Sequence, residues 1–125
     1  MNTLRVLIVE REGYFAKDLS ENLKKMELEV ITNPGHRHKE VLHILEEGHF
    51  VVAIISLVRG DLTLVKKIRK EFGEIFLIIL SDLSETELNI SEIEGLKPIG
   101  LCIKPVASEE IQDYIIAFQI NKEDS

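Results

Sequence analysis

Short apolar runs alternate with longer polar–apolar segments along the whole chain. The apolar runs have the β-branched composition of strands that are buried on both faces. They are residues 4–9, 28–32, 50–57, 75–80 and 100–103. In the segments that follow them, apolar residues recur at spacings of three and four, as on one face of a helix. Phe15, Leu19, Leu23 and Met26 form the clearest of these stripes.

Turn and capping residues mark the ends of the predicted helices. Gly48 is placed to end the second helix, and Gly73 to end the third. Asp61 and Ser108 are placed to cap the third and the last helix. The pattern over residues 84–96 is weaker, so it predicts a helix that is short or mobile.

This order predicts an α/β fold in which five βα units form one parallel sheet covered by helices on both faces. The length of 125 residues fits a single domain. We expect its core over residues 1–120, with 121–125 as a polar tail or linker stub. Ligands of such sheets bind outside the carboxyl ends of the strands. The segments at those ends are Glu10–Gly13, Ser56–Asp61, Ser81–Ser84 and Lys104–Pro105.

Composition narrows the class of protein. Apolar residues are 45% of the chain, charged residues are 30%, and the net charge is −7. This balance indicates a soluble domain and argues against nucleic-acid binding, which needs a basic surface. Cys102 is the single cysteine and lies in an apolar run, so we expect a small buried side chain and a reducing cytoplasm. No apolar run approaches the roughly 18 residues of a membrane span, and no signal peptide is recognisable.

Landmarks at the predicted strand ends resemble one family. Residues 100–105 form a last strand that ends in Lys104 and Pro105, Ser81 ends the fourth strand, and residues 46–50 precede the third. With the five βα units, the whole chain resembles a response-regulator receiver domain, the flavodoxin-like, CheY-like module of two-component signalling. The resemblance implies the strand order 2-1-3-4-5 and a cis peptide bond between Lys104 and Pro105.

The family's chemistry depends on a small set of side chains. An acidic pair after the first strand binds Mg²⁺, and an aspartate that ends the third strand accepts a phosphoryl group. A lysine and a serine or threonine then hold this group. In this sequence Glu10 and Arg11 stand at the acidic pair, Ser56 at the aspartate, Ser81 at the hydroxyl residue and Lys104 at the lysine.

The departures from this pattern predict a degenerate phosphorylation site. A serine hydroxyl is a poor nucleophile without a base, and the cation of Arg11 opposes a metal. The loop 57–61 is shorter than the usual family loop, and Leu101 replaces the usual aromatic residue. We therefore expect a pseudo-receiver that binds no metal or cofactor. Its degenerate site comprises Glu10, Arg11, Ser56, Ser81, Lys104 and Pro105.

Simpler roles are expected for several of these residues. Glu10 can pair with Arg11 and Lys104 as a structural remnant, or with Glu12 as a magnesium site. Serines that end strands commonly bond to neighbouring backbone groups, which we expect for Ser56 and Ser81. The basic cluster at Lys66, Lys67, Arg69 and Lys70 is expected to be the solvated face of the third helix, and His36, His38, His43 and His49 lack a metal-ligand spacing.

These observations predict a signalling domain that acts by protein–protein interaction and is not an enzyme. The resemblance places contacts with a protein partner or a second copy on the fourth helix, fifth strand and fifth helix, about residues 84–118. Two alternatives remain open. One is a phosphorylatable receiver with Asp61 or Asp82 as an atypical acceptor. The other is a small flavodoxin-like enzyme or cofactor binder, although Glu10–Tyr14 is not a glycine-rich phosphate cradle.

Overall fold

A computed structural model describes residues 4–123 of the chain. The strands form one parallel sheet in the order β2-β1-β3-β4-β5. They are β1 (Arg5–Val9), β2 (Glu29–Asn33), β3 (Val52–Ser56), β4 (Phe76–Ser81) and β5 (Ile99–Ile103). The helices are α1 (Gly13–Lys24), α2 (His38–Gly48), α3 (Thr63–Glu71), α4 (Ile90–Glu94) and α5 (Ser108–Glu123). The predicted fold class and strand order are confirmed.

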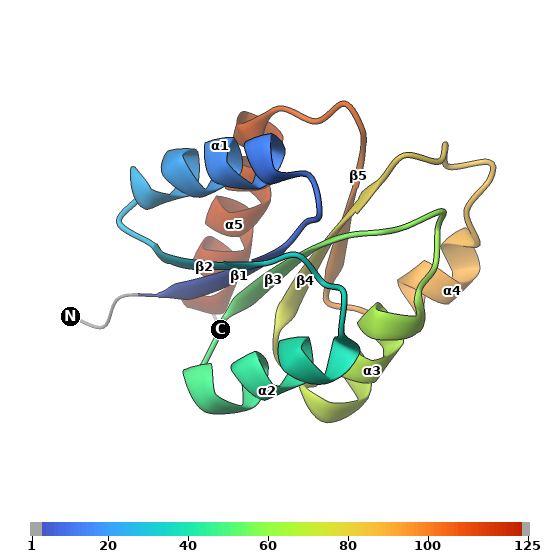
Figure 1. Ribbon diagram of the computed structural model, residues 1–125, viewed down its shortest axis with the longest axis horizontal. Coiled ribbons are helices and arrows are strands. Elements are labelled where there is room, and N and C mark those ends of the chain that lie inside the picture. The colour runs from blue at the N-terminus through green and yellow to red at the C-terminus, as the bar shows by residue number, and fades with distance from the viewer. Residues whose placement is uncertain (1–3, 124–125) are drawn as a thin grey trace.

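Helices cover both faces of the sheet (Figure 1). α1 and α5 lie on one face, and α2 and α3 lie on the other with α4 towards the β5 edge. Side chains alternate along each strand, so Ile54 packs under α1 and α5, and Ile55 packs under α2 and α3. Every residue of β4 is buried. This double burial explains why the strands are continuous apolar runs in the sequence.

The fourth helix has only five residues, so the prediction of a short helix is confirmed. It begins after Asn89, whose side-chain oxygen accepts a hydrogen bond from the Glu92 backbone N–H at 3.1 Å. Residues 84–89 form no helix, and Lys66 of α3 pairs with Glu92 and ties α4 to its neighbour. No helix within residues 4–123 combines the length and the apolar character that crossing a membrane requires.

The expectation of a fully solvated basic cluster on α3 is wrong for Arg69. Its guanidinium is half-buried and donates hydrogen bonds to four backbone carbonyls, at distances of 2.7 to 3.0 Å. They belong to Phe72, Gly73, Leu96 and Pro98. Burial lowers the pKa of Arg69. The planar fork of five N–H donors thus joins the end of α3 to the segment between α4 and β5.

Cys102 is buried in β5, as predicted. Burial, with a smaller contribution from the charge of Glu110, raises the pKa of its thiol to about 11. Because the thiolate is the reactive form, this cysteine is a structural residue rather than a nucleophile.

Replacing Arg69 with methionine should destabilise the domain by about 2–4 kcal/mol, because four carbonyls lose a charged donor while the apolar stem is kept. Urea unfolding should report the change in the free energy of unfolding. Lys70→Met on the same helix is the control, since Lys70 is exposed and should change stability by less than about 0.5 kcal/mol. Equal effects of the two substitutions would contradict a role for Arg69 as a structural clamp.

Candidate functional site

Four of the predicted site residues meet at the carboxyl edge of the sheet. Val9 pairs with Ile55 across β1 and β3, so Glu10 and Ser56 follow side by side. A cavity of about 350 Å³ opens at this edge. Its lining includes Glu10, Arg11, Ser56 and Lys104, together with the alternative acceptors Asp61 and Asp82. Ser81 ends the neighbouring strand β4 but is not part of the lining.

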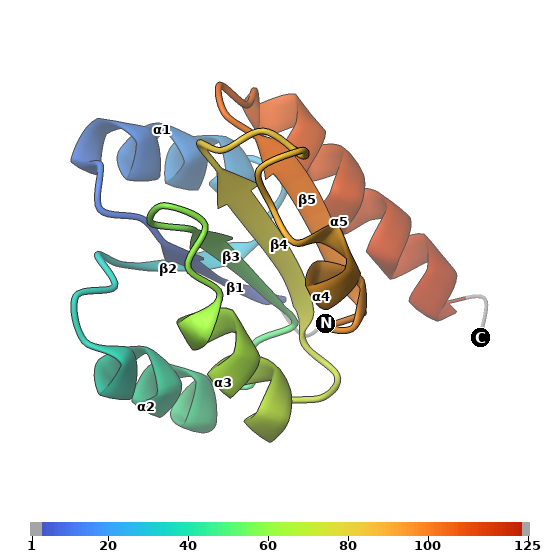
Figure 2. The same cartoon turned by 90° about the vertical axis from the view of Figure 1, so that its right-hand side faces the viewer.

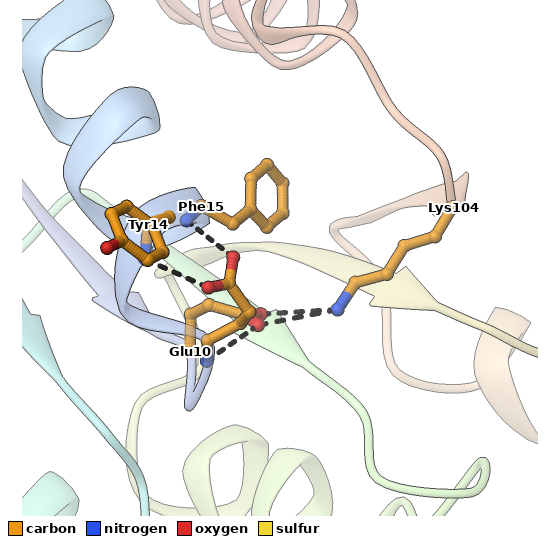
Figure 3. A network of polar contacts seen from close by, with 5 residues as sticks. Glu10, Tyr14, Phe15 and Lys104 are labelled. Carbon is orange, nitrogen blue, oxygen red and sulfur yellow. Dashed lines mark hydrogen bonds and ion pairs between the residues drawn. The ribbon is translucent and has the colours of Figure 1, made fainter.

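Glu10 and Lys104 form an ion pair across this edge (Figure 3). The Lys104 Nζ lies 3.3 Å and 3.5 Å from the two Glu10 carboxylate oxygens. The Glu10 side chain is 4% exposed, and the Lys104 side chain is 29% exposed and lies over the Phe15 ring. The predicted pair is therefore confirmed for these two residues. Arg11 does not take part, because its side chain is exposed and forms no ion pair within residues 4–123.

Glu12 caps α1, a role that the sequence analysis missed. Its carboxylate accepts hydrogen bonds from the backbone N–H groups of Tyr14 at 3.0 Å and Phe15 at 2.6 Å (Figure 3). The Glu12 backbone N–H in turn donates to Glu10 at 3.2 Å. The sequence could have indicated this role, because Glu12 is an acidic residue directly before the apolar stripe of the first predicted helix. Carboxylates at N-caps accept hydrogen bonds from free backbone N–H groups.

The residues present do not fit the magnesium site that the resemblance implies. Glu10 is committed to Lys104 and Glu12 to the start of α1. Arg11 places a cation beside them. Within residues 4–123, no group of three or more His, Cys, Asp or Glu side chains is arranged to hold a metal ion.

Ser56 departs from its expected local hydrogen bond. Its hydroxyl oxygen is buried and has no hydrogen-bond partner among residues 4–123. A serine within a helix can donate to the backbone carbonyl one turn before it. Ser56 ends a strand, so it has no preceding helical turn that could supply such a carbonyl. A buried hydroxyl without a partner costs about 1–3 kcal/mol. Ser56, which the resemblance places at the acceptor aspartate, lines the cavity without a hydrogen bond to another described residue.

Ser81 makes the local hydrogen bonds that were expected. Its fully buried hydroxyl donates to the Leu83 carbonyl and accepts from the Leu83 backbone N–H, both at 3.0 Å. Leu83 also packs over Gly60, where an added Cβ would meet its side chain at 2.8 Å. Gly60 has a φ of +74°, which suits glycine. The segment after β4 is thus fixed both to Ser81 and to the loop after β3.

The two alternative acceptor aspartates have different surroundings. Asp61 accepts hydrogen bonds from the Thr63 hydroxyl at 2.6 Å and from its backbone N–H at 3.0 Å. These bonds, the hydroxyl bond first, lower the pKa of Asp61. The prediction that Asp61 caps α3 is wrong, because Leu62 is the N-cap residue and Asp61 instead bonds to Thr63, the first residue of the helix. Asp82 is exposed and has no hydrogen bond or ion pair within the described residues 4–123.

The peptide bond between Lys104 and Pro105 is cis, as predicted. A second cis peptide bond, between Lys97 and Pro98, was not foreseen.

Comparison with solved structures decides what the fold is. A CheY-like receiver domain protein of Methanospirillum hungatei has a TM-score of 0.83 and 18% identity, with 98% of each chain covered. The chemotaxis protein CheY4 of Vibrio cholerae has a TM-score of 0.78 and 20% identity, with 93% of this chain and 98% of that chain covered. HP1043, an orphan response regulator of H. pylori, has a TM-score of 0.78 and 16% identity, with 91% and 94% covered.

The fold is that of response-regulator receiver domains. No family model matches the chain, and no curated protein matches its sequence significantly. At such low identity the receiver structures show the fold alone, so the function must be argued from the side chains at the carboxyl edge of the sheet. These neighbours are signalling domains rather than classical enzymes.

Removing Lys104 should be costly, because Glu10 would remain as a buried carboxylate without its partner. We expect Lys104→Met to lower the free energy of unfolding by about 2–4 kcal/mol, measured by urea unfolding. The double variant Glu10→Gln, Lys104→Met should recover more than half of this loss, because the uncompensated charge is gone. Lys97→Met is the matched control for an exposed lysine. Additive effects of the two substitutions would show that the pair has no structural coupling.

Magnesium titration tests the conclusion that the acidic pair is lost. Backbone amide shifts of Glu10, Arg11 and Ser56 should not change saturably as Mg²⁺ rises through the millimolar range, because no free carboxylate pair is present. A chloride salt of matched ionic strength without a divalent ion controls for screening. Saturable shifts centred on Glu10 and Ser56 would show that a magnesium site exists.

Proposed function

We propose that this chain is a signalling domain with the receiver fold that is not phosphorylated and acts by binding another protein. One observation carries the proposal. The position of the acceptor aspartate is held by Ser56, whose buried hydroxyl has no base or other hydrogen-bond partner within residues 4–123. A hydroxyl without a base is a weak nucleophile.

The rest of the edge supports loss of phosphotransfer. Phosphoryl transfer depends mainly on positioning and on neutralisation of charge by metal and cations. Here Lys104 is paired with Glu10, and Arg11 stands where the second metal ligand belongs. A phosphoryl group at this site would therefore lack its nucleophile and its metal, and would have to compete with Glu10 for the lysine.

The structure also supports a fixed rather than a switching domain. In the resembled family, the hydroxyl after strand four moves the following segment by bonding the phosphoryl group. In this chain the Ser81 hydroxyl is already bonded to Leu83. Lys66 pairs with Glu92, and Arg69 bonds the carbonyls of Leu96 and Pro98. These contacts favour one arrangement of the segment from β4 to β5.

We further propose that the interaction surface consists of α4, β5 and α5, about residues 84–118, and that it serves a protein partner or a second copy. No enzymatic activity, cofactor, nucleic acid or membrane is part of this proposal. The domain would work in the cytoplasm, as the single unpaired cysteine suggests. We treat the chain as one domain, in which α5 extends to Glu123.

Phosphorylation at an atypical acceptor is the second candidate function. Asp82 is exposed at the cavity that Lys104 also lines, and no other side chain within the described residues binds it. Asp61 is less suited, because Thr63 occupies its carboxylate. The cofactor-binding alternative is weakened further, because the Glu12 carboxylate occupies the start of α1, where a phosphate would bind.

A small phosphodonor and Mg²⁺ should leave the wild type and Ser56→Asp unmodified, as intact mass would show. The new carboxylate of Ser56→Asp restores a nucleophile but leaves the metal unsupported. The double variant Ser56→Asp, Arg11→Asp should form at most a trace of adduct, since it returns a second carboxylate to the edge.

Asp82→Asn is the control for the alternative acceptor. A hydroxylamine-sensitive adduct on the wild type that disappears in Asp82→Asn would replace the proposal with an atypical receiver. An adduct that survives this substitution would direct the search to Asp61.

A further inference from the structure

α4, β5 and α5 lie next to one another at one edge of the sheet (Figure 2). β5 is an edge strand that pairs only with β4. Tyr114 of α5 lies over this strand, and its hydroxyl donates to the Leu101 carbonyl at 3.3 Å. The Tyr114 ring occupies the space above Gly100, where an added Cβ would lie 2.8 Å from it. Tyr114 is 36% exposed, so it is held in place but remains accessible.

Partly exposed apolar side chains lie on the other face of β5 from Tyr114, towards the core under α2 and α3. Ile99, Leu101 and Ile103 of β5 are neither fully buried nor fully exposed. Protein interfaces commonly have an apolar and aromatic centre with a polar rim, and tyrosine is frequent among their strongest contacts. This edge has the composition of such a centre.

The charges around this centre are strongly unequal. Residues 84–118 contain seven carboxylates and two lysines. Glu92 is paired with Lys66, and Lys104 is paired with Glu10. Lys97 is then the one remaining lysine of the segment, and it is exposed. The remaining carboxylates, also exposed, are Glu85, Glu87, Glu94, Glu109, Glu110 and Asp113.

Helical geometry places carboxylates on both sides of β5. Glu92 is directed to α3, so Glu94, two residues further on, lies on the opposite side of α4. On α5, Glu110 lies one turn before Tyr114, on the same side of the helix. Glu94 and Glu110 therefore lie on the two helices that flank the apolar edge.

We infer that this surface binds a protein partner with a basic contact surface, and not a second copy of the chain. A twofold dimer would place the same acidic rim against itself, with Lys97 as the one free lysine per copy to offset it. Like charges across an interface are strongly unfavourable, whereas a basic rim would be attracted and oriented. The phosphates of nucleic acid would be repelled. The inference rests on the proposed function and specifies its partner.

The test uses the full chain and a short amphipathic peptide of leucine and lysine as a basic probe. Backbone amide shifts should change mainly within residues 84–118, and the affinity should fall as salt is raised. The double variant Glu110→Lys, Asp113→Lys should weaken binding at least about tenfold. The control variant Glu46→Lys, Glu71→Lys changes exposed carboxylates at the ends of α2 and α3 and should leave the affinity within about twofold.

Sedimentation should show that the wild type is monomeric at low salt. The inference fails if the peptide does not bind, if both double variants weaken binding equally, or if the wild type forms a dimer that Glu110→Lys, Asp113→Lys dissociates. Circular dichroism checks that the variants are folded. Phosphorylation of the wild type would overturn the proposed function and leave peptide binding measurable. Failure of peptide binding with no phosphorylation would overturn only the choice of partner.

Discussion

The ion pair between Glu10 and Lys104 is the interaction on which the carboxyl edge of the sheet depends. It joins the ends of β1 and β5, although β3 and β4 lie between them in the sheet. A carboxylate that is 4% exposed needs a compensating charge, since desolvation otherwise costs several kcal/mol. Ser56 supplies no carboxylate at this edge, and Glu10 is the carboxylate with which Lys104 pairs. Under the proposed function, this closed pair and the absence of a carboxylate at Ser56 together leave no site for phosphotransfer.

The two serines at neighbouring strand ends differ in how their hydroxyls are bonded within residues 4–123. Ser56 keeps a buried hydroxyl without a partner, while Ser81, at the end of the next strand, satisfies both its donor and its acceptor with Leu83. The two serines differ because the segment after Ser81 folds back, which brings the backbone N–H and carbonyl of Leu83 to the Ser81 hydroxyl. Locally unfavourable groups are expected where a fold once served or still serves function, and the rest of the structure compensates for them.

The fold could be predicted because each buried strand is an apolar run and each long helix has an apolar stripe. The strand order followed from the resemblance, and the Glu10–Lys104 pair followed from their places at strand ends. Arg69 could not be predicted, because the carbonyls that bind it belong to the end of α3 and to the segment before β5, which come together only in the folded chain. The free hydroxyl of Ser56 was missed for the same reason, since a missing neighbour leaves no pattern in the sequence.

The proposed fixed arrangement of α4, β5 and α5 changes what could regulate this domain. A ligand or modification shifts a conformational equilibrium only if it binds one state better than the other. The Ser81 hydroxyl bonds to Leu83, and Lys66 pairs with Glu92 between α3 and α4, so both contacts would have to break before a ligand could favour a second arrangement. Under the proposed function, the amount of the partner and its charge would then control how often the two proteins bind. An acidic rim suits this, because electrostatic complementarity sets association rate and partner choice more than final affinity.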